Sequence, residues 1–295
     1  MPTQPPRTWF VTGAGSGFGL EVTTQLLAAG QRVAATSHTL SAALKELSAQ
    51  HGDRLWTAAL DVTEPATVRA VVDQAFSELG RIDVVFSSAG FGALGAAEEL
   101  SDELLRRQLA VNLLGPIHLT RAVTPWLRTQ GGGRIIQMSS SGGHVPDPGM
   151  SVYNASKFGV EGFFESAAVE LAAFGIEVTL IAPGGTRTAF NANITQAEPL
   201  AAYADGVLGQ VRGALAGGMD ETTLRHAVAG DPVKIARAIV ASADTTPAPR
   251  RLVFGAAAYE TIANAWQQRL EALAAQRELA FGTDADDVLA DRANA

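Results

Sequence analysis

Short apolar runs alternate with helical patterns along most of this chain, and this alternation restricts its fold more than any other feature. Runs that are short, apolar and bounded by turn residues indicate strands. They occupy residues 9–12, 32–36, 55–60, 82–86, 134–138, 176–181 and 251–254. Helical patterns lie between them, at residues 20–30, 41–50, 64–79, 102–109, 112–128, 153–174 and 231–240. Such alternation predicts an α/β fold, in which helices cover both faces of a parallel sheet and the ligand binds at the carboxyl ends of the strands.

A glycine-rich segment follows the first predicted strand. Residues 12–19 read Thr-Gly-Ala-Gly-Ser-Gly-Phe-Gly. A strand, a glycine turn and a helix together aim backbone N–H groups and a helix N-terminus at a phosphate. The usual dinucleotide spacing G-x-G-x-x-G is absent, and a flexible turn is the alternative interpretation. The position of the segment at the first strand–helix junction favours phosphate binding.

Tyr153 and Lys157 lie four residues apart in a predicted helix, and therefore on one of its faces. A nearby cation favours the ionised form of a phenol, so such a pair can form a proton donor and acceptor for a carbonyl oxygen. Ser140 stands thirteen residues before Tyr153, just after the strand at 134–138, and could share that oxygen. The alternative is a surface pair that arises by chance, and only the rest of the chain decides between the two.

Composition excludes several classes of protein. Hydrophobic residues make up 47% of the chain and charged residues 18%, which predicts a large buried core. The net charge of −8 argues against nucleic acid or an anionic membrane as a partner. The chain has no cysteine, and its five histidines show no metal-ligand spacing. It also lacks a secretory signal pattern and an apolar run of about 18 residues, so we expect a cytoplasmic protein without a metal.

Taken together, the motifs resemble those of the short-chain dehydrogenase/reductase family over about residues 7–255. The resemblance implies a single domain with one doubly wound, seven-stranded Rossmann-like sheet. The cofactor-binding residues that it implies are Gly13, Ser16, Gly17, Phe18, Gly19, Ser37, His38, Asp61, Val62, Ser88, Ala89, Gly90, Tyr153, Lys157, Pro183, Gly184, Thr186 and Thr188.

The same resemblance implies NAD(P)-dependent hydride transfer between a carbonyl compound and its alcohol. Tyr153 would give its proton to the carbonyl oxygen, and Ser140 would hold that oxygen by a hydrogen bond. Lys157 would bind the ribose hydroxyls of the cofactor and lower the pKa of Tyr153. Asn112, which matches the family's helix asparagine, would hold a water that feeds protons to Lys157.

Two positions depart from the family pattern. The segment after the fourth strand reads Ser-Ser-Ala-Gly rather than Asn-Asn-Ala-Gly, so the contact from Ser88 to the ribose has shorter reach. After the second strand, Ser37 stands where an NAD-dependent relative carries an acidic residue, and His38 stands where NADP-dependent relatives often carry arginine. The second departure predicts NADP(H) as the preferred cofactor, with NAD(H) as the alternative.

The region after residue 184 indicates how the substrate is covered. Residues 189–230 are apolar but show no long regular element, which predicts a covering segment. The candidate pocket residues Phe91, His144, Val145 and Phe190 indicate a hydrophobic ketone or aldehyde. Residues 256–281 predict a C-terminal helix whose apolar stripe serves as core or subunit contact, while residues 1–6 and 282–295 are expected to be flexible. The resemblance further implies a homodimer or homotetramer formed through the helices that begin at residues 112 and 153.

Two other functions compete with this interpretation. A catalytically idle, NAD(P)-binding regulator of the same fold has no need of Ser140, Asn112, Tyr153 and Lys157 together. A nucleotide-sugar epimerase or dehydratase has a larger C-terminal substrate domain than the roughly 110 residues that follow Pro183 here. The arrangement of the site, rather than the fold, must decide among these functions.

Overall fold

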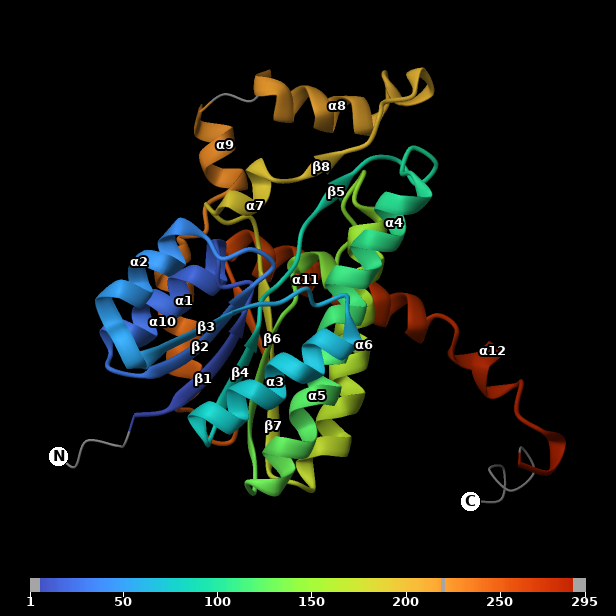
Figure 1. The fold of residues 1–295 in the computed structure, drawn as a ribbon. Helices are drawn as coiled ribbons and strands as arrows, with labels where there is room; N and C mark the ends of the chain where they lie inside the picture. Colours follow the sequence, from blue (N-terminus) through green and yellow to red (C-terminus); the bar gives the residue numbers. More distant parts are fainter. Residues whose placement is uncertain (1–5, 219–220, 289–295) are drawn as a thin grey trace.

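The computed structural model describes residues 6–218 and 221–288. Within them, seven parallel strands form one sheet in the order β3-β2-β1-β4-β6-β7-β9 (Figure 1). The strands are β1 (Thr8–Thr12), β2 (Arg32–Ser37), β3 (Leu55–Ala59), β4 (Val84–Ser87), β6 (Gly133–Met138), β7 (Ile176–Pro183) and β9 (Arg251–Phe254). The predicted α/β class and the doubly wound, seven-stranded sheet are confirmed.

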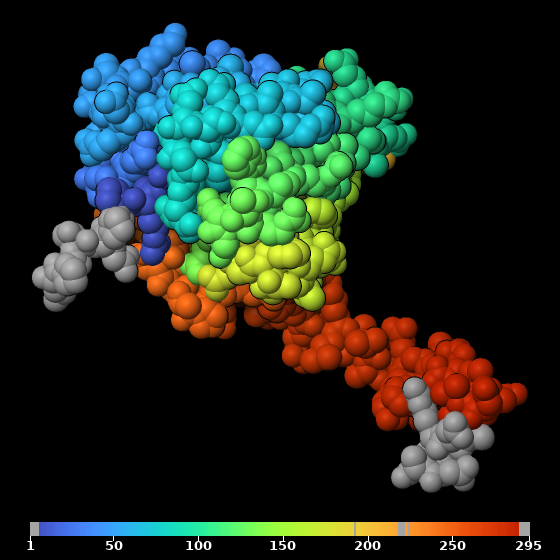
Figure 2. All heavy atoms as spheres, turned by 60° about the horizontal axis from the view of Figure 1, so that its bottom comes forward, coloured from blue at the N-terminus to red at the C-terminus, as the bar shows by residue number. Residues whose placement is uncertain are grey.

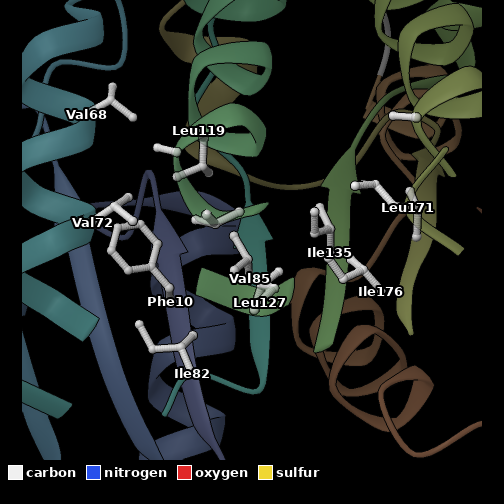
Figure 3. Close-up of a cluster of buried hydrophobic side chains, with 14 of the residues drawn as sticks. Phe10, Val68, Val72, Ile82, Val85, Leu119, Leu127, Ile135, Leu171 and Ile176 are labelled. Atoms are coloured by element: carbon white, nitrogen blue, oxygen red, sulfur yellow. The ribbon is translucent and has the colours of Figure 1, made fainter. Parts of the chain in front are cut away.

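Two layers of helices cover the sheet. One face packs against α1 (Gly17–Ala28), α2 (Ala42–His51) and α10 (Pro232–Ser242), and the other against α3 (Pro65–Leu79), α5 (Gly115–Thr129) and α6 (Ser151–Ala172). Successive residues of a strand point to opposite faces, so in β1 Phe10 enters the core under α3 while Trp9 and Val11 enter the other core. Figure 3 shows the first core, where Phe10 lies near Val72.

The strand order reverses between β1 and β4, and this reversal positions the site. From β1 the chain proceeds outward through β2 and β3, then returns to β4 on the other side of β1. Neighbouring crossovers therefore leave the sheet on opposite faces, which opens a crevice at the carboxyl ends of the two central strands. The glycine turn after β1 and the serine-rich segment after β4 both lie at this crevice.

A π-helical turn separates two helices that precede β6. We expected one helix from residue 112, but α4 (Asp102–Leu109) continues into a π-helical turn (Ala110–Leu114) before α5 begins at Gly115. Asn112 lies within this turn with its side chain fully buried. Such turns occur often at functional sites, because the extra residue shifts which side chains face inward.

The segment 189–230 contains more regular structure than its sequence predicts. Its elements are α7 (Ala189–Ala192), β8 (Thr195–Gln196), a 3-10 turn (Ala201–Tyr203), α8 (Val207–Gly213), a π-helical turn (Ala214–Gly218) and α9 (Glu221–Ala227). Strand β8 pairs with β5 (Ala93–Leu94), a short strand that we did not predict. Elements this short leave little periodic signal. Residues 219–220 lie outside the described part of this segment.

The C-terminal region forms an arm that extends from the body (Figures 1 and 2). The predicted helix at 256–281 is divided into α11 (Ala256–Ala274) and α12 (Arg277–Phe281). Ile262 is buried, but Leu270 and Leu273 are 60% and 65% exposed, so the stripe is not core along its outer half. The flexible ends that we predicted fall largely on residues 1–5 and 289–295, which lie outside the described residues.

Among the described residues, none of the helices combines the length and the apolar character that crossing a membrane requires.

Candidate active site

The crevice contains two adjoining cavities, of about 280 and 650 Å³. Gly13, Ser16, Ala89, Gly90 and Phe91 line both of them, so the two form one continuous cleft. The smaller cavity contains the tyrosine, lysine and serine predicted as catalytic, and the larger contains the residues that follow β2 and β3. The cleft therefore has a candidate reaction centre at one end and room for the remainder of a long ligand at the other.

The glycine turn brings backbone N–H groups to the wall of the cleft. Gly13 has a φ of +68°, and a Cβ there would lie 2.9 Å from the backbone of Ala89, so only glycine fits. Gly19 does not line the cleft but packs directly against the Gly13 carbonyl, where a Cβ would lie 2.3 Å from the oxygen. The Ser16 side chain makes no capping hydrogen bond to α1, which leaves the helix N-terminus facing the cleft. Free N–H groups at a helix N-terminus fit an anion such as a pyrophosphate.

Three of the four predicted catalytic residues line the smaller cavity. Tyr153 and Lys157 come from successive turns of α6, and Ser140 lies just after β6, at the start of a 3-10 turn. Lys157 Nζ donates a hydrogen bond to the Met138 carbonyl at 3.1 Å and lies 5.8 Å from the centre of the Tyr153 ring. A phenol, an ammonium and a hydroxyl therefore meet at one wall, as proton transfer to a substrate oxygen requires.

Burial sets the proton affinities of the pair. It raises the pKa of Tyr153 to about 12, although a hydrogen bond with Ser140 acts in the opposite direction and the charge of Asp147 adds to the rise. It also lowers the pKa of Lys157 to about 8, while the charge of Glu161 acts to raise it. The net change for Tyr153 is a rise in pKa, because loss of hydration outweighs the other effects. Tyr153 is therefore a protonated phenol at neutral pH. The lowering effect of Lys157 that the family resemblance implies stays a prediction.

Asn112 lies behind the cleft rather than in its wall. Its Oδ1 accepts a hydrogen bond from the Phe91 amide at 3.0 Å, and its Nδ2 donates to the Phe91 carbonyl at 2.8 Å. Gln108 donates to the same carbonyl at 3.0 Å. The Asn112 side chain thus holds the backbone after β4 in place. Nδ2 also donates to Ser156 Oγ at 3.4 Å, and the water-holding role implied by the family resemblance stays a prediction.

The segment after β7 forms the wall opposite α6. Pro183, Gly184, Thr186 and Thr188 line the smaller cavity as predicted. Thr188 also caps α7, since its hydroxyl accepts a hydrogen bond from the Phe190 amide at 3.3 Å. Residues that we did not predict complete the lining of this cavity, namely Met138, Ser139 and Ser141 at the end of β6 and after it, and Gly185, Asn191 and Asn193 after β7. Only the asparagines carried a sequence signal, because they follow the threonine motif closely.

The larger cavity contains the residues predicted to bind the adenosine half of a cofactor. Ser37, His38, Asp61 and Val62 all line it. The Ser37 hydroxyl donates to the Thr39 carbonyl at 2.8 Å, so its proton is already engaged. His38 Nε2 lies 3.6 Å from Asp61 Oδ2.

Asp61 remains ionised in this cavity. Burial tends to raise its pKa, but hydrogen bonds from the amide and hydroxyl of Thr63 and the charges of His38 and Arg107 hold the pKa below its usual value. Arg107, on α4, also lines the cavity and stacks over the Phe91 ring at 5.6 Å. We did not predict Arg107, since the sequence cannot show which of two adjacent arginines faces the cleft.

Two of the four predicted substrate-pocket residues lie elsewhere. Phe91 and Phe190 line the smaller cavity, and the Phe190 ring lies 5.7 Å from that of Tyr153. His144 and Val145 do not line either cavity. The chain turns sharply through a 3-10 turn (Ser141–Gly143), which carries His144 behind the cleft, where its Nε2 lies 3.2 Å from Glu161 Oε1.

The donors in this cleft fit a dinucleotide cofactor. The open N-terminus of α1 suits a pyrophosphate, Asp61 and Val62 lie at one end, and the candidate catalytic groups lie at the other. Among the described residues, no cluster of three or more acidic or histidine side chains could hold a metal ion.

Known proteins of similar sequence include oxidoreductases. A family model described as short chain dehydrogenase matches residues 7–199. An uncharacterized oxidoreductase of Schizosaccharomyces pombe is 32% identical over 95% of this chain and 92% of its own length. A 3-ketodihydrosphingosine reductase of Bacteroides thetaiotaomicron is 38% identical over 65% of this chain and 69% of its own. Two other matched relatives align over about two thirds of their length.

Solved structures resemble the fold of this chain over nearly its whole length. A short-chain dehydrogenase from Streptomyces avermitilis is 33% identical, covers 95% of this chain with 100% of its own, and has a TM-score of 0.84. Other structures of the same fold hold NADP in one case and NAD in another.

Proposed function

This chain belongs to the short-chain dehydrogenase family, and we propose that, as an NAD(P)-dependent oxidoreductase, it interconverts a hydrophobic ketone or aldehyde and the corresponding alcohol. The observation that carries the proposal is the position of Tyr153, Lys157 and Ser140 in the same cavity as the glycine turn. A regulator that only sensed a cofactor would have no use for these three groups there.

The proposed cofactor site runs the length of the cleft. The N-terminus of α1 would hold the pyrophosphate, Asp61 and Val62 the adenine, and Lys157 the ribose next to the nicotinamide. Thr186 and Thr188 would orient the nicotinamide ring. When bound, the cofactor supplies or accepts the hydride, and the protein supplies position and proton transfer.

In the reducing direction, Tyr153 would act as the general acid. As a hydride joins the carbonyl carbon, the proton of the Tyr153 hydroxyl moves to the carbonyl oxygen and an alcohol forms. Ser140 donates a hydrogen bond to that oxygen while negative charge develops on it, and Lys157 supplies a positive charge nearby. The reaction reverses when the tyrosinate accepts the proton of an alcohol.

The walls of the smaller cavity favour an apolar substrate. Phe91, Met138 and Phe190 supply apolar surface beside Tyr153. One relative is named a 3-ketodihydrosphingosine reductase. Asn191 and Asn193 add polar groups at the far wall, which suits a substrate with one polar substituent away from its carbonyl.

Replacing Tyr153 with phenylalanine tests the proposal. Tyr153→Phe removes one hydroxyl from the site, and we expect kcat for ketone reduction to fall by at least about 10³-fold while the cofactor still binds. Tyr259→Phe is the matched control, because Tyr259 is 66% exposed on α11. NAD(P)H absorbance measures turnover, and NAD(P)H fluorescence measures binding. Activity of Tyr153→Phe within tenfold of the parent would exclude Tyr153 as the general acid.

A further inference from the structure

A buried cluster of charged side chains lies directly behind Lys157. Glu161 is one turn after Lys157 on α6, and its side chain is only 7% exposed. Residues four apart on a helix lie on one face, with Cβ atoms about 5–6 Å apart. A carboxylate that is buried on the face of the catalytic-site lysine is costly unless it balances a charge.

Glu161 is fixed by groups from two other elements. Its Oε2 accepts two hydrogen bonds from Arg251 of β9, from Nε at 3.0 Å and from Nη2 at 2.5 Å. Its Oε1 faces His144 Nε2 at 3.2 Å, a contact that is electrostatic rather than a well-aligned hydrogen bond. Burial tends to raise the pKa of Glu161, but His144, Ser139 and Arg251 together keep it below its usual value. The carboxylate is therefore ionised and immobile.

Arg251 does not neutralise Glu161 alone, because it also binds a second carboxylate. Its Nη2 donates to Glu165 Oε1 at 2.5 Å. Two anions, Glu161 and Glu165, thus face two cations, Arg251 and Lys157. Glu165 is 56% exposed and lies one turn farther along α6, so water screens its charge much more than that of Glu161.

Helix α11 covers this cluster. The Trp266 ring packs edge-on against His144 at 5.4 Å and lies 5.7 Å from the Arg251 guanidinium. Arg269 donates to the His144 carbonyl at 2.6 Å. The first part of the C-terminal arm therefore shields the charges from solvent before the arm leaves the body (Figure 2). Shielding strengthens the interaction between Glu161 and Lys157, because water would otherwise weaken it.

We propose that Glu161 is a positioning residue for the active site: its carboxylate, fixed by Arg251 and His144 under the cover of α11, keeps the Lys157 ammonium charged and in place. The inference rests on the proposed function, which assigns Lys157 to the active site. The other titratable groups near this place are Tyr153, which lines the smaller cavity, Asp147, whose charge acts on Tyr153, and Arg269 above His144. Of all these groups, Glu161 is the one whose charge acts to raise the pKa of Lys157, against the effect of burial.

The lysine itself can report on this proposal. Lys45, Lys157 and Lys234 are the lysines of the sequence, and the first and last are exposed. NMR of full-length protein labelled with ¹³C-lysine therefore follows the titration of Lys157 directly, with Lys157→Met to assign its signal. Glu161→Gln should lower the midpoint by on the order of 1 pH unit, because it removes a negative charge at close range. Glu165→Gln, which removes the other partner of Arg251, should move it by less than half as much.

A second variant, which should shift the Lys157 midpoint in the opposite direction, separates an effect of charge from a general loss of structure. Arg251→Gln leaves the Glu161 charge less compensated, so the Lys157 midpoint should rise. If Glu161→Gln does not fold, Arg251→Gln alone tests the proposal. A Lys157 midpoint that is unchanged or lower in Arg251→Gln would then refute it. If Glu161→Gln folds and the midpoint does not move, or if Glu165→Gln shifts it equally, the cluster is structural only.

Kinetics links the same shift to turnover. If the midpoint falls by about 1 unit from about 8, the protonated fraction of Lys157 at pH 8 falls about fivefold, and kcat/KM for reduction should fall with it. At pH 6 the loss should be small, whereas a purely structural defect would reduce activity at both pH values. The NMR measurement does not require turnover. If Tyr153→Phe remained active, the proposed function would be refuted, and the effect of Glu161 on the Lys157 titration could still be tested.

Discussion

At the scale of single residues, the buried lysine of the candidate active site is costly to the fold. Lys157 lies in the wall of the cleft with 5% of its surface exposed, and burial lowers its pKa from 10.5 to about 8. Between these two pH values the unfolded chain binds more protons than the folded one, so the free energy of unfolding increases as pH rises through this window. Below pH 8 the folded state retains the whole cost of holding a buried cation.

Replacing this lysine should therefore stabilise the protein. We expect Lys157→Met to raise the free energy of unfolding at pH 7 by up to about 3 kcal/mol, the equivalent of the pKa shift, and to abolish turnover. The Met138 carbonyl keeps a hydrogen bond from Gln137. Thermal unfolding at pH 7 and pH 10 measures the effect, and the gain should shrink at pH 10. A variant less stable than the parent at pH 7 would show that the Lys157 contacts outweigh the cost of its burial.

Cofactor choice is also decided by a few residues. Ser37 replaces the acidic residue that would repel a 2′-phosphate, and Arg107 contributes positive charge to the same cavity, which His38 also lines. The Ser37 proton is engaged by Thr39, and His38 faces Asp61, so neither is fully free to bind a phosphate.

We therefore expect a modest preference for NADPH, about tenfold in kcat/KM, the lower limit for a charge-assisted hydrogen bond. Ser37→Asp should reverse it. Steady-state kinetics with both cofactors tests the expectation, and tenfold better use of NADH by the parent would contradict it.

At the scale of elements, the covering segment is tied to the body rather than loose. Glu99, whose side chain is fully buried, accepts hydrogen bonds from Arg212 of α8 at 2.7 and 3.0 Å and from the Leu200 amide at 2.8 Å. These bonds lower the pKa of Glu99 to about 2, with Arg212 as the main cause. One carboxylate thus fastens two parts of the segment to the loop before α4.

Removing this carboxylate should loosen the segment. We expect Glu99→Gln to increase amide hydrogen exchange over residues 200–213 and to raise KM more than it lowers kcat. Glu98→Gln is the control, because Glu98 accepts a hydrogen bond from the Tyr203 hydroxyl of the same segment at 2.7 Å and does not bind Arg212. In the parent, cofactor and product together should slow exchange over residues 189–218. Equal exchange in Glu99→Gln and the parent would show that other contacts hold the segment.

At the scale of the whole molecule, two surfaces remain apolar. Helix α6 exposes Phe158 and Val169 by 40% and 72%, Phe174 just after the helix is 42% exposed, and the outer half of α11 exposes its apolar stripe. Scattered apolar residues are ordinary on a protein surface, but rows of them along one helix indicate contact with another chain.

We expect a homodimer or homotetramer that buries the outer face of α6. Val169→Glu should dissociate it by placing a charge in the interface, while Glu170→Lys on the same turn should leave it intact if Glu170 lies at the rim. Sedimentation velocity measures the mass of the parent and of both variants. A parent that sediments as a monomer at micromolar concentration would contradict this expectation.

The sequence by itself determined the sheet, because strands and helices of this length carry strong periodic signals and each glycine or serine motif follows a strand. It also located Tyr153, Lys157 and Ser140, since a four-residue helical spacing already places the first two on one face. Tertiary structure alone decided which way His144 turns, that Arg107 faces the cleft, and that the Asn112 side chain binds the Phe91 backbone. It alone also brought Arg251, from the last strand, onto Glu161. These contacts join residues far apart in the chain, and no local spacing records how helices and strands pack against one another.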